Sequence, residues 1–162
     1  MIAKLLTVVG TGLTAVMIAG RPVPAAAPAA PQIREIADLT LRDVAVAVYD
    51  SAHPVIYYNP TLMKQFGPEL ALFFMAHEHA HISLKHTRAG ALRSAAPNQR
   101  DRVLQQKELE ADCLAARRLG EDGRDGSMAA VRFFSRLGDR SFDAEHPSGT
   151  ARAAKILSCM PK

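Results

Sequence analysis

The chain has 162 residues, of which 48% are hydrophobic and only 6% aromatic, and its formal net charge at pH 7 is +4. Removing Lys4 and Arg21 with the N-terminal segment leaves +2, an excess too small for a nucleic-acid-binding protein, so we predict no nucleic-acid partner. The remaining length suffices for one domain with a modest core, and the abundant alanine favours helices.

Residues 1–31 have the order of a secretory signal peptide. Lys4 precedes a short apolar run, Leu5 to Gly20, and an Ala/Pro-rich stretch with the small-residue site Ala25 to Ala27 follows. The apolar run is short for a transmembrane helix, which needs about 20 residues. We therefore predict a protein exported to the periplasm or secreted, with membrane contact only in the alternative that this segment is retained as an anchor.

The next segment predicts a small β-structure. Residues Ile33 to Thr40 are compatible with a short helix. "DVAVAVYD", Asp43 to Asp50, alternates valine with smaller residues, and "PVIYYNP", Pro54 to Pro60, indicates a second strand after a turn at "SAH". These strands predict a hairpin, and a hairpin this small needs helices packed on it.

The rest of the chain predicts helices. A helix that opens at Gly67-Pro68 and continues to His86 is apolar nearly all round, which indicates burial. After a surface loop, three further helices are expected: Arg100 to Leu119 ending at Gly120, Ser127 to Leu137 closed by Gly138, and a short helix capped by Ser148. We expect a mostly helical α+β domain over residues 32–162.

Four of the six histidines lie within twelve residues, Met75 to His86. Among them His77, Glu78 and His81 form H-E-x-x-H, in which two imidazoles four residues apart on a helix bind zinc. Both rings lie on one helix face and can reach one tetrahedral ion, whereas Glu78 lies at the flank of that face and His79 points away. The competing interpretation is a pair of hydrogen-bonded core histidines without a metal.

A zinc hydrolase needs a third protein ligand. The metzincin continuation is excluded, because Leu84 and Thr87 stand where its glycine and third histidine would be. The helix with "KELEAD" offers three acids; Glu108 and Asp112 share its apolar stripe, and Glu110 lies opposite. Two carboxylates on such a stripe need a cation, so Glu108 is the predicted ligand and Asp112 the acid that holds a ligand imidazole. Alternatively, both are surface acids that pair with basic neighbours.

The two cysteines, Cys113 and Cys159, are an even count in a chain predicted to be exported. An oxidising compartment favours a disulfide between them, which would tie the C-terminal segment to the helix around Cys113. The alternative is two buried free thiols.

Three motifs, "HEHAHISLKH", "ELEAD" and "HPSGTAR", follow one another along the chain. In this order they resemble the gluzincin zinc peptidases typified by HtpX, the Oma-type mitochondrial protease and BepA, and the resemblance covers Val44 to Arg152. It implies a minimal gluzincin fold, with a small β-hairpin or sheet packed on the active-site helix. The absence of further apolar runs and a short loop between the zinc motifs set this chain apart as a compact, exported version.

The resemblance also implies roles for individual residues. Glu108 is then the third ligand of one zinc ion, and Asp112 is its supporting acid. His146 and Arg152 approach the metal from the C-terminal segment. The outer histidine, His86, is structural rather than a ligand.

We therefore predict a zinc metalloendopeptidase that acts on exported or misfolded proteins. Glu78 would take a proton from water and return it to the leaving amine, and His146 or Arg152 would donate to the oxyanion, although Arg152 could instead orient a carboxylate. An extended peptide would add to an exposed strand edge of the hairpin, near Tyr57 to Asn59. The alternative is a catalytically silent zinc-binding or chaperone-like module of the same fold.

Overall fold

The computed structural model describes residues 32–49, 52–87, 90, 93, 95–121 and 126–161. The predicted signal segment, residues 1–31, and part of the loop predicted after the H-E-x-x-H helix lie outside these ranges. The elements in chain order are β1 (Arg34–Ala37), β2 (Ala45–Val48), β3 (Val55–Tyr58), α1 (Pro60–Phe66), α2 (Pro68–Ser83), the 3-10 turn η1 (Pro97–Gln99), α4 (Arg100–Glu121), α5 (Gly126–Leu137) and α6 (Gly149–Cys159). The predicted class, α+β and mostly helical, is confirmed.

The sheet has the order β1-β3-β2, so β2 is an edge strand. The predicted hairpin is confirmed in the antiparallel pairing of β2 with β3, in which Ala45 lies opposite Tyr58, although both strands are shorter than expected. The predicted helix at 33–40 is wrong, because this segment contains β1, which pairs in parallel with β3. Its backbone gains partners in β3 and its flanks, as in the bond from Asp38 N–H to Tyr58 C=O, and this tertiary pairing outweighs a weak local helix preference.

Helix α1 was not expected from the sequence. Asn59 begins it as an N-cap, because its side-chain oxygen accepts hydrogen bonds from the N–H groups of Thr61 and Leu62, and Pro60 occupies the first helical position. Gly67, with φ of 81°, then turns the chain directly into α2. Helix α2 ends at Ser83, earlier than predicted.

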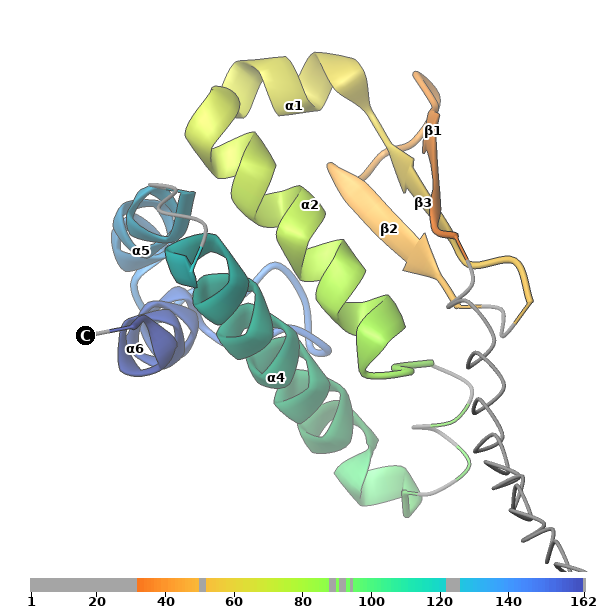
Figure 1. The fold of residues 1–162 in the computed structure, drawn as a ribbon. Helices are drawn as coiled ribbons and strands as arrows, with labels where there is room; N and C mark the ends of the chain where they lie inside the picture. The colour runs from red at the N-terminus through yellow and green to blue at the C-terminus, as the bar shows by residue number, and fades with distance from the viewer. Residues whose placement is uncertain are drawn as a thin grey trace, which may run out of the picture.

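Helix α2 lies in the middle of the molecule, with the sheet on one side and α4, α5 and α6 on the other (Figure 1). This position explains why it is apolar nearly all round. The main core lies among the four helices, and a smaller one lies between α2 and the sheet, made of Ala45, Ile56, Met63 and Ile82. Helix α4 continues past the expected end at Gly120, where a Cβ atom would clash with the ring of Pro161, so glycine lets the chain after α6 pack on α4.

The predicted disulfide is confirmed: Cys113 on α4 is bonded to Cys159 on α6. The bond joins two helices that also contact each other directly. Across the described part of the chain, no helix combines the length and the hydropathy needed to cross a bilayer.

Candidate metal centre

Two imidazoles of α2 and one carboxylate of α4 meet in the interior. The Nε2 atoms of His77 and His81 lie 2.9 Å apart, and the Glu108 carboxylate lies 3.1 Å from the first and 3.3 Å from the second. One ligand atom from each residue lies within 4.8 Å of the other two. In a tetrahedral zinc site with bonds of about 2.0–2.1 Å, donor atoms stand roughly 3.3 Å apart. The three side chains therefore fit one such ion in both donor type and spacing.

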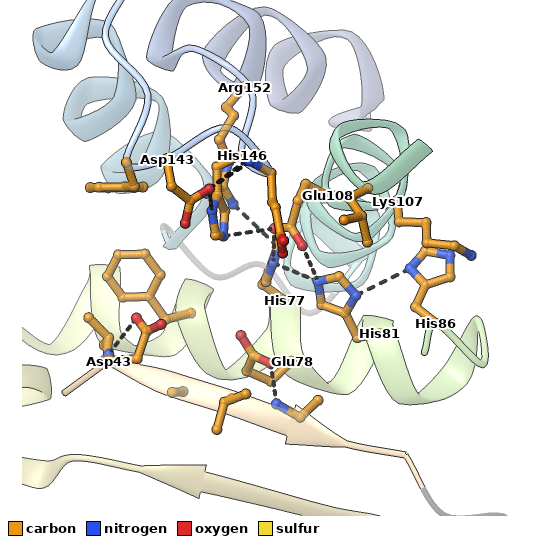
Figure 2. Close-up of a pocket in the computed structure, with 18 of the residues that line it drawn as sticks. Asp43, His77, Glu78, His81, His86, Lys107, Glu108, Asp143, His146 and Arg152 are labelled. Atoms are coloured by element: carbon orange, nitrogen blue, oxygen red, sulfur yellow. Dashed lines mark hydrogen bonds and ion pairs between the residues drawn. The ribbon is translucent and has the colours of Figure 1, made fainter. Parts of the chain in front are cut away.

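The packing of α2 against α4 brings these side chains together. The stripe of α4 that contacts the core contains small residues, and Ala111, Ala115 and Ala116 are fully buried. Small side chains let two helices approach closely, so that Glu108 reaches across to α2 (Figure 2). The helical phase predicted for α4 is confirmed, since Asp112 is buried and Glu110 is partly exposed.

The electrostatics of the site favour a cation. Burial alone would lower the pKa of His77, but hydrogen bonds with Asp112 and Glu108 outweigh it and raise this pKa to about 10. Burial would likewise raise the pKa of Glu108, but its bonds to the two imidazoles hold the pKa far below the usual range. Buried carboxylates that stabilise positive charge this strongly create the negative potential that a divalent ion neutralises.

Asp112 lies behind the first histidine, where the sequence predicted a supporting acid. It is fully buried, and its Oδ1 lies 2.9 Å from His77 Nδ1, the ring nitrogen that does not face Glu108. Arg152 of α6 donates two hydrogen bonds to Asp112, of 2.7 and 2.8 Å, and its guanidinium lies 4.0 Å from the ring centre of Phe134. The sequence analysis gave Arg152 two alternative roles, donation to the oxyanion or orientation of a carboxylate. Its contacts with Asp112 match the second role.

His146 approaches the ligand set from the loop before α6. Its Nε2 lies 3.8 Å from Glu108, and its Nδ1 lies 2.8 Å from the carboxylate of Asp143 (Figure 2). The same Asp143 oxygen accepts the backbone N–H groups of Glu145 and His146, so it fixes both the turn and the ring. The sequence analysis missed Asp143; the available signal was an acid three residues before a candidate histidine, in the turn-forming stretch "DAEH".

Glu78 connects the metal site to the sheet. Its Oε2 accepts a 2.6 Å hydrogen bond from the N–H of Ala47, on the edge strand β2. Glu78, the three candidate ligands, His146 and Arg152 line one cavity of about 610 Å³. Three phenylalanines that stack edge to face, Phe66, Phe74 and Phe133, form an apolar part of its wall.

Several histidines and tyrosines lie apart from the ligand set. His79 points away from it, as predicted, and contacts Glu35 of β1 at 2.7 Å. His86 lies behind His81 rather than beside Glu108. The expectation that Tyr57 to Asn59 line the cleft is wrong: the lining residues of the cavity do not include them, and Asn59 is occupied as the cap of α1.

A family model described as a "putative metallopeptidase domain" matches residues 11–145. The matched range contains His77, Glu78, His81 and Glu108, and it ends one residue before His146. No curated protein and no solved structure matches the chain.

Proposed function

The chain belongs to the metallopeptidase-domain family whose model covers residues 11–145, and on that premise we propose that it is a zinc-dependent endopeptidase. The observation that carries the proposal is the position of Glu78, in the same cavity as a His77, His81 and Glu108 set that could hold a metal ion. A structural zinc site is usually closed by four protein ligands, whereas a catalytic one keeps a position open. Three candidate ligands beside a carboxylate and a cavity fit the catalytic kind.

His77, His81 and Glu108 would hold one zinc ion. Zinc bound by two imidazoles and a carboxylate lowers the pKa of a coordinated water to about 7 and polarises a carbonyl group. Asp112 would hold one proton of His77 on Nδ1, and the other proton, which the raised pKa keeps on Nε2 in the metal-free site, would leave when Nε2 binds the ion. The ligand nitrogen is thereby oriented before the ion arrives.

Glu78 would move the proton. Its Oε2 is held by Ala47 N–H, which leaves Oε1 to take a proton from the attacking water. The water oxygen then bonds to the substrate carbonyl carbon, and the proton passes from Glu78 to the amide nitrogen as the C–N bond breaks. His146 would donate its Nδ1–H to the Asp143 carboxylate, and in the imidazolium form, with a second proton on Nε2, it would also donate to the oxyanion.

The free edge of β2 would bind the substrate. Val44 C=O accepts the N–H of Asn59, and because antiparallel bonds alternate, Ala45 and Ala47 direct their backbone groups away from β3. An extended peptide can pair with such an edge, and here it would use the backbone groups of Ala45 and the C=O of Ala47, because the N–H of Ala47 is bonded to Glu78. This arrangement supports protein or peptide substrates.

The apolar wall of the cavity suggests which proteins these are. Phe66, Phe74 and Phe133 would accept a large apolar side chain of the bound peptide. Such side chains are buried in folded proteins and exposed in misfolded ones. The disulfide is compatible with an oxidising compartment. We therefore propose misfolded or exported proteins as substrates, and that the chain is a compact relative of the gluzincin peptidases typified by HtpX, the Oma-type protease and BepA.

The experiment compares hydrolysis of unfolded casein by wild type and by Glu78→Gln, after both are loaded with zinc. We expect Glu78→Gln to lose activity about 10²- to 10⁴-fold while the bound zinc, measured by mass spectrometry, stays at one ion per chain. Glu121→Gln, a change at an exposed glutamate of α4, is the matched control and should keep full activity. Unchanged hydrolysis by Glu78→Gln would refute the mechanism; zinc binding without hydrolysis in wild type would point to the silent module.

A further inference from the structure

A second chain of contacts begins at the ring nitrogen of His81 that faces away from the candidate ligands. His81 Nδ1 lies 3.2 Å from His86 Nδ1. His86 Nε2 in turn lies 3.2 Å from a carboxylate oxygen of Glu110, and the His86 side chain is only 6% exposed. Gln106, one turn earlier on α4, donates a 3.0 Å bond to the other oxygen of Glu110. Three titratable groups therefore form a line from the metal site to the surface of α4.

The local fold builds this line. After α2 ends at Ser83, Lys85 takes a positive φ of 56° and reverses the chain. The N–H of His86 then bonds to the C=O of His81, which returns the His86 ring over the last turn of α2. Glu110 lies on the far face of α4 from the core, and this returning segment brings a histidine to it. The helical phase of α4 excludes Glu110 as a ligand, but Glu110 is linked to the candidate ligand His81 through His86.

Chemistry fixes where each proton lies along this line. If His81 binds a cation through Nε2, its remaining proton is on Nδ1 and must be donated. The facing atom, His86 Nδ1, can accept it only as the unprotonated nitrogen of a neutral ring. His86 then carries its proton on Nε2 and donates it to Glu110. One arrangement of protons satisfies all three groups.

We propose that His86 and Glu110 are positioning residues that fix the tautomer and orientation of the metal ligand His81. They would do for His81 what Asp112 and Arg152 do for His77, with a neutral ring in place of a direct carboxylate. This inference rests on the proposed zinc site. It assigns a role to Glu110, which does not touch the ligands itself.

The first test measures the dissociation constant of Zn²⁺ by competition with a chromophoric chelator, on the full chain. His86→Leu leaves the His81 proton without an acceptor, and we expect zinc binding to weaken about 10- to 100-fold. Glu110→Ala should weaken it in the same direction by less. His86→Gln should recover most of the affinity, because an amide oxygen can accept from His81 while its NH₂ group donates to Glu110. Glu121→Ala, at an exposed glutamate of the same helix, should change nothing.

The second test uses a readout that a purely structural role would not move. In the zinc-loaded protein, ¹⁵N spectra of the histidine rings should show the proton of His81 on Nδ1 and that of His86 on Nε2. Unaltered zinc binding in both His86→Leu and Glu110→Ala, or a His86 proton on Nδ1, would overturn the positioning role and leave the zinc site intact. Failure of wild type to bind Zn²⁺ would instead overturn the proposed function, and this inference with it.

Discussion

The two candidate histidine ligands lie one turn apart on α2, yet the groups behind them differ. His77 is backed by Asp112 and Arg152, an ion pair in which both side chains are almost completely buried. His81 is backed by His86 and Glu110, and the carboxylate at the end of that line is 44% exposed. We call these pairs the His77 support and the His81 support.

Because the two supports differ in burial and charge, we expect one to affect folding stability and the other to affect metal binding. A buried ion pair must be complete, because a buried charge without its partner is costly. A neutral histidine that is hydrogen-bonded to an exposed carboxylate involves no buried charge, so the loss of one partner costs little free energy. The His77 support should therefore contribute to the stability of the metal-free protein, whereas the His81 support should matter chiefly when a metal is bound.

The largest effect is expected from breaking the His77 support. Asp112→Ala leaves the guanidinium of Arg152 buried and unpaired among the helices, and we expect a loss of about 3–5 kcal/mol in the free energy of unfolding. Urea denaturation of the metal-free protein, followed by circular dichroism, measures it. Glu110→Ala under the same conditions should cost less than about 1 kcal/mol.

A double variant separates lost charge balance from lost packing. Removing both partners in Asp112→Leu/Arg152→Met leaves neither member of the ion pair unpaired, so most of the stability should return, less the contribution of the Asp112 bond to His77, while zinc binding stays weak. If the double variant is as unstable as Asp112→Ala, the cost lies in packing around Phe134, and the distinction between the supports fails.

A smaller loss is expected from removing the disulfide, which reinforces the same support. Cys113 directly follows Asp112 on α4, and Cys159 lies on α6 together with Arg152. Replacing both cysteines by alanine should lower the free energy of unfolding by about 2–4 kcal/mol, since the bond closes a loop between residues 46 apart. Wild type kept under reductant should unfold at the same urea concentration as the variant with both cysteines replaced by alanine. A large difference between the two urea midpoints would contradict this account.

The residues of the His77 support also show how much of the site could be predicted from the sequence. Glu108 and Asp112 share an apolar stripe, and two acids on such a stripe already predict a buried cation partner. The disulfide was predicted from an even cysteine count together with the expectation that the chain is exported. These features are local, because helical periodicity and residue chemistry within one segment carry them.

The features that the sequence did not reveal depend on contacts between distant segments. Strand β1 exists because β3 supplies its hydrogen-bond partners, and four residues such as Arg34–Ala37 have no preference strong enough to show it. Glu110 lies on the exposed face of α4, where the sequence predicts an ordinary surface acid. Only the turn after α2 brings His86 to it. The role of Asp143 can be recognised only from the structure, in which the loop that contains it places His146 near Glu108.

Zinc binding should stabilise the protein by an amount within the range expected for the disulfide. At a free concentration of about 100 times the dissociation constant, binding adds about 2.7 kcal/mol to the free energy of unfolding. The melting temperature should rise accordingly, and a chelator should reverse the rise. His81→Ala lacks a candidate ligand and should show little of this shift; an equal shift in that variant would place the metal elsewhere.

A small effect is expected from a change at Asn59, remote from both supports, and it tests whether instability alone weakens metal binding. Asn59→Ala removes the cap of α1, and we expect a loss of about 1 kcal/mol in the free energy of unfolding. Because Asn59 contacts neither histidine support, the zinc dissociation constant should stay at its wild-type value in chelator competition. A weakening as large as that of Glu110→Ala would mean that zinc affinity follows general stability, and the comparison between the two supports would lose its meaning.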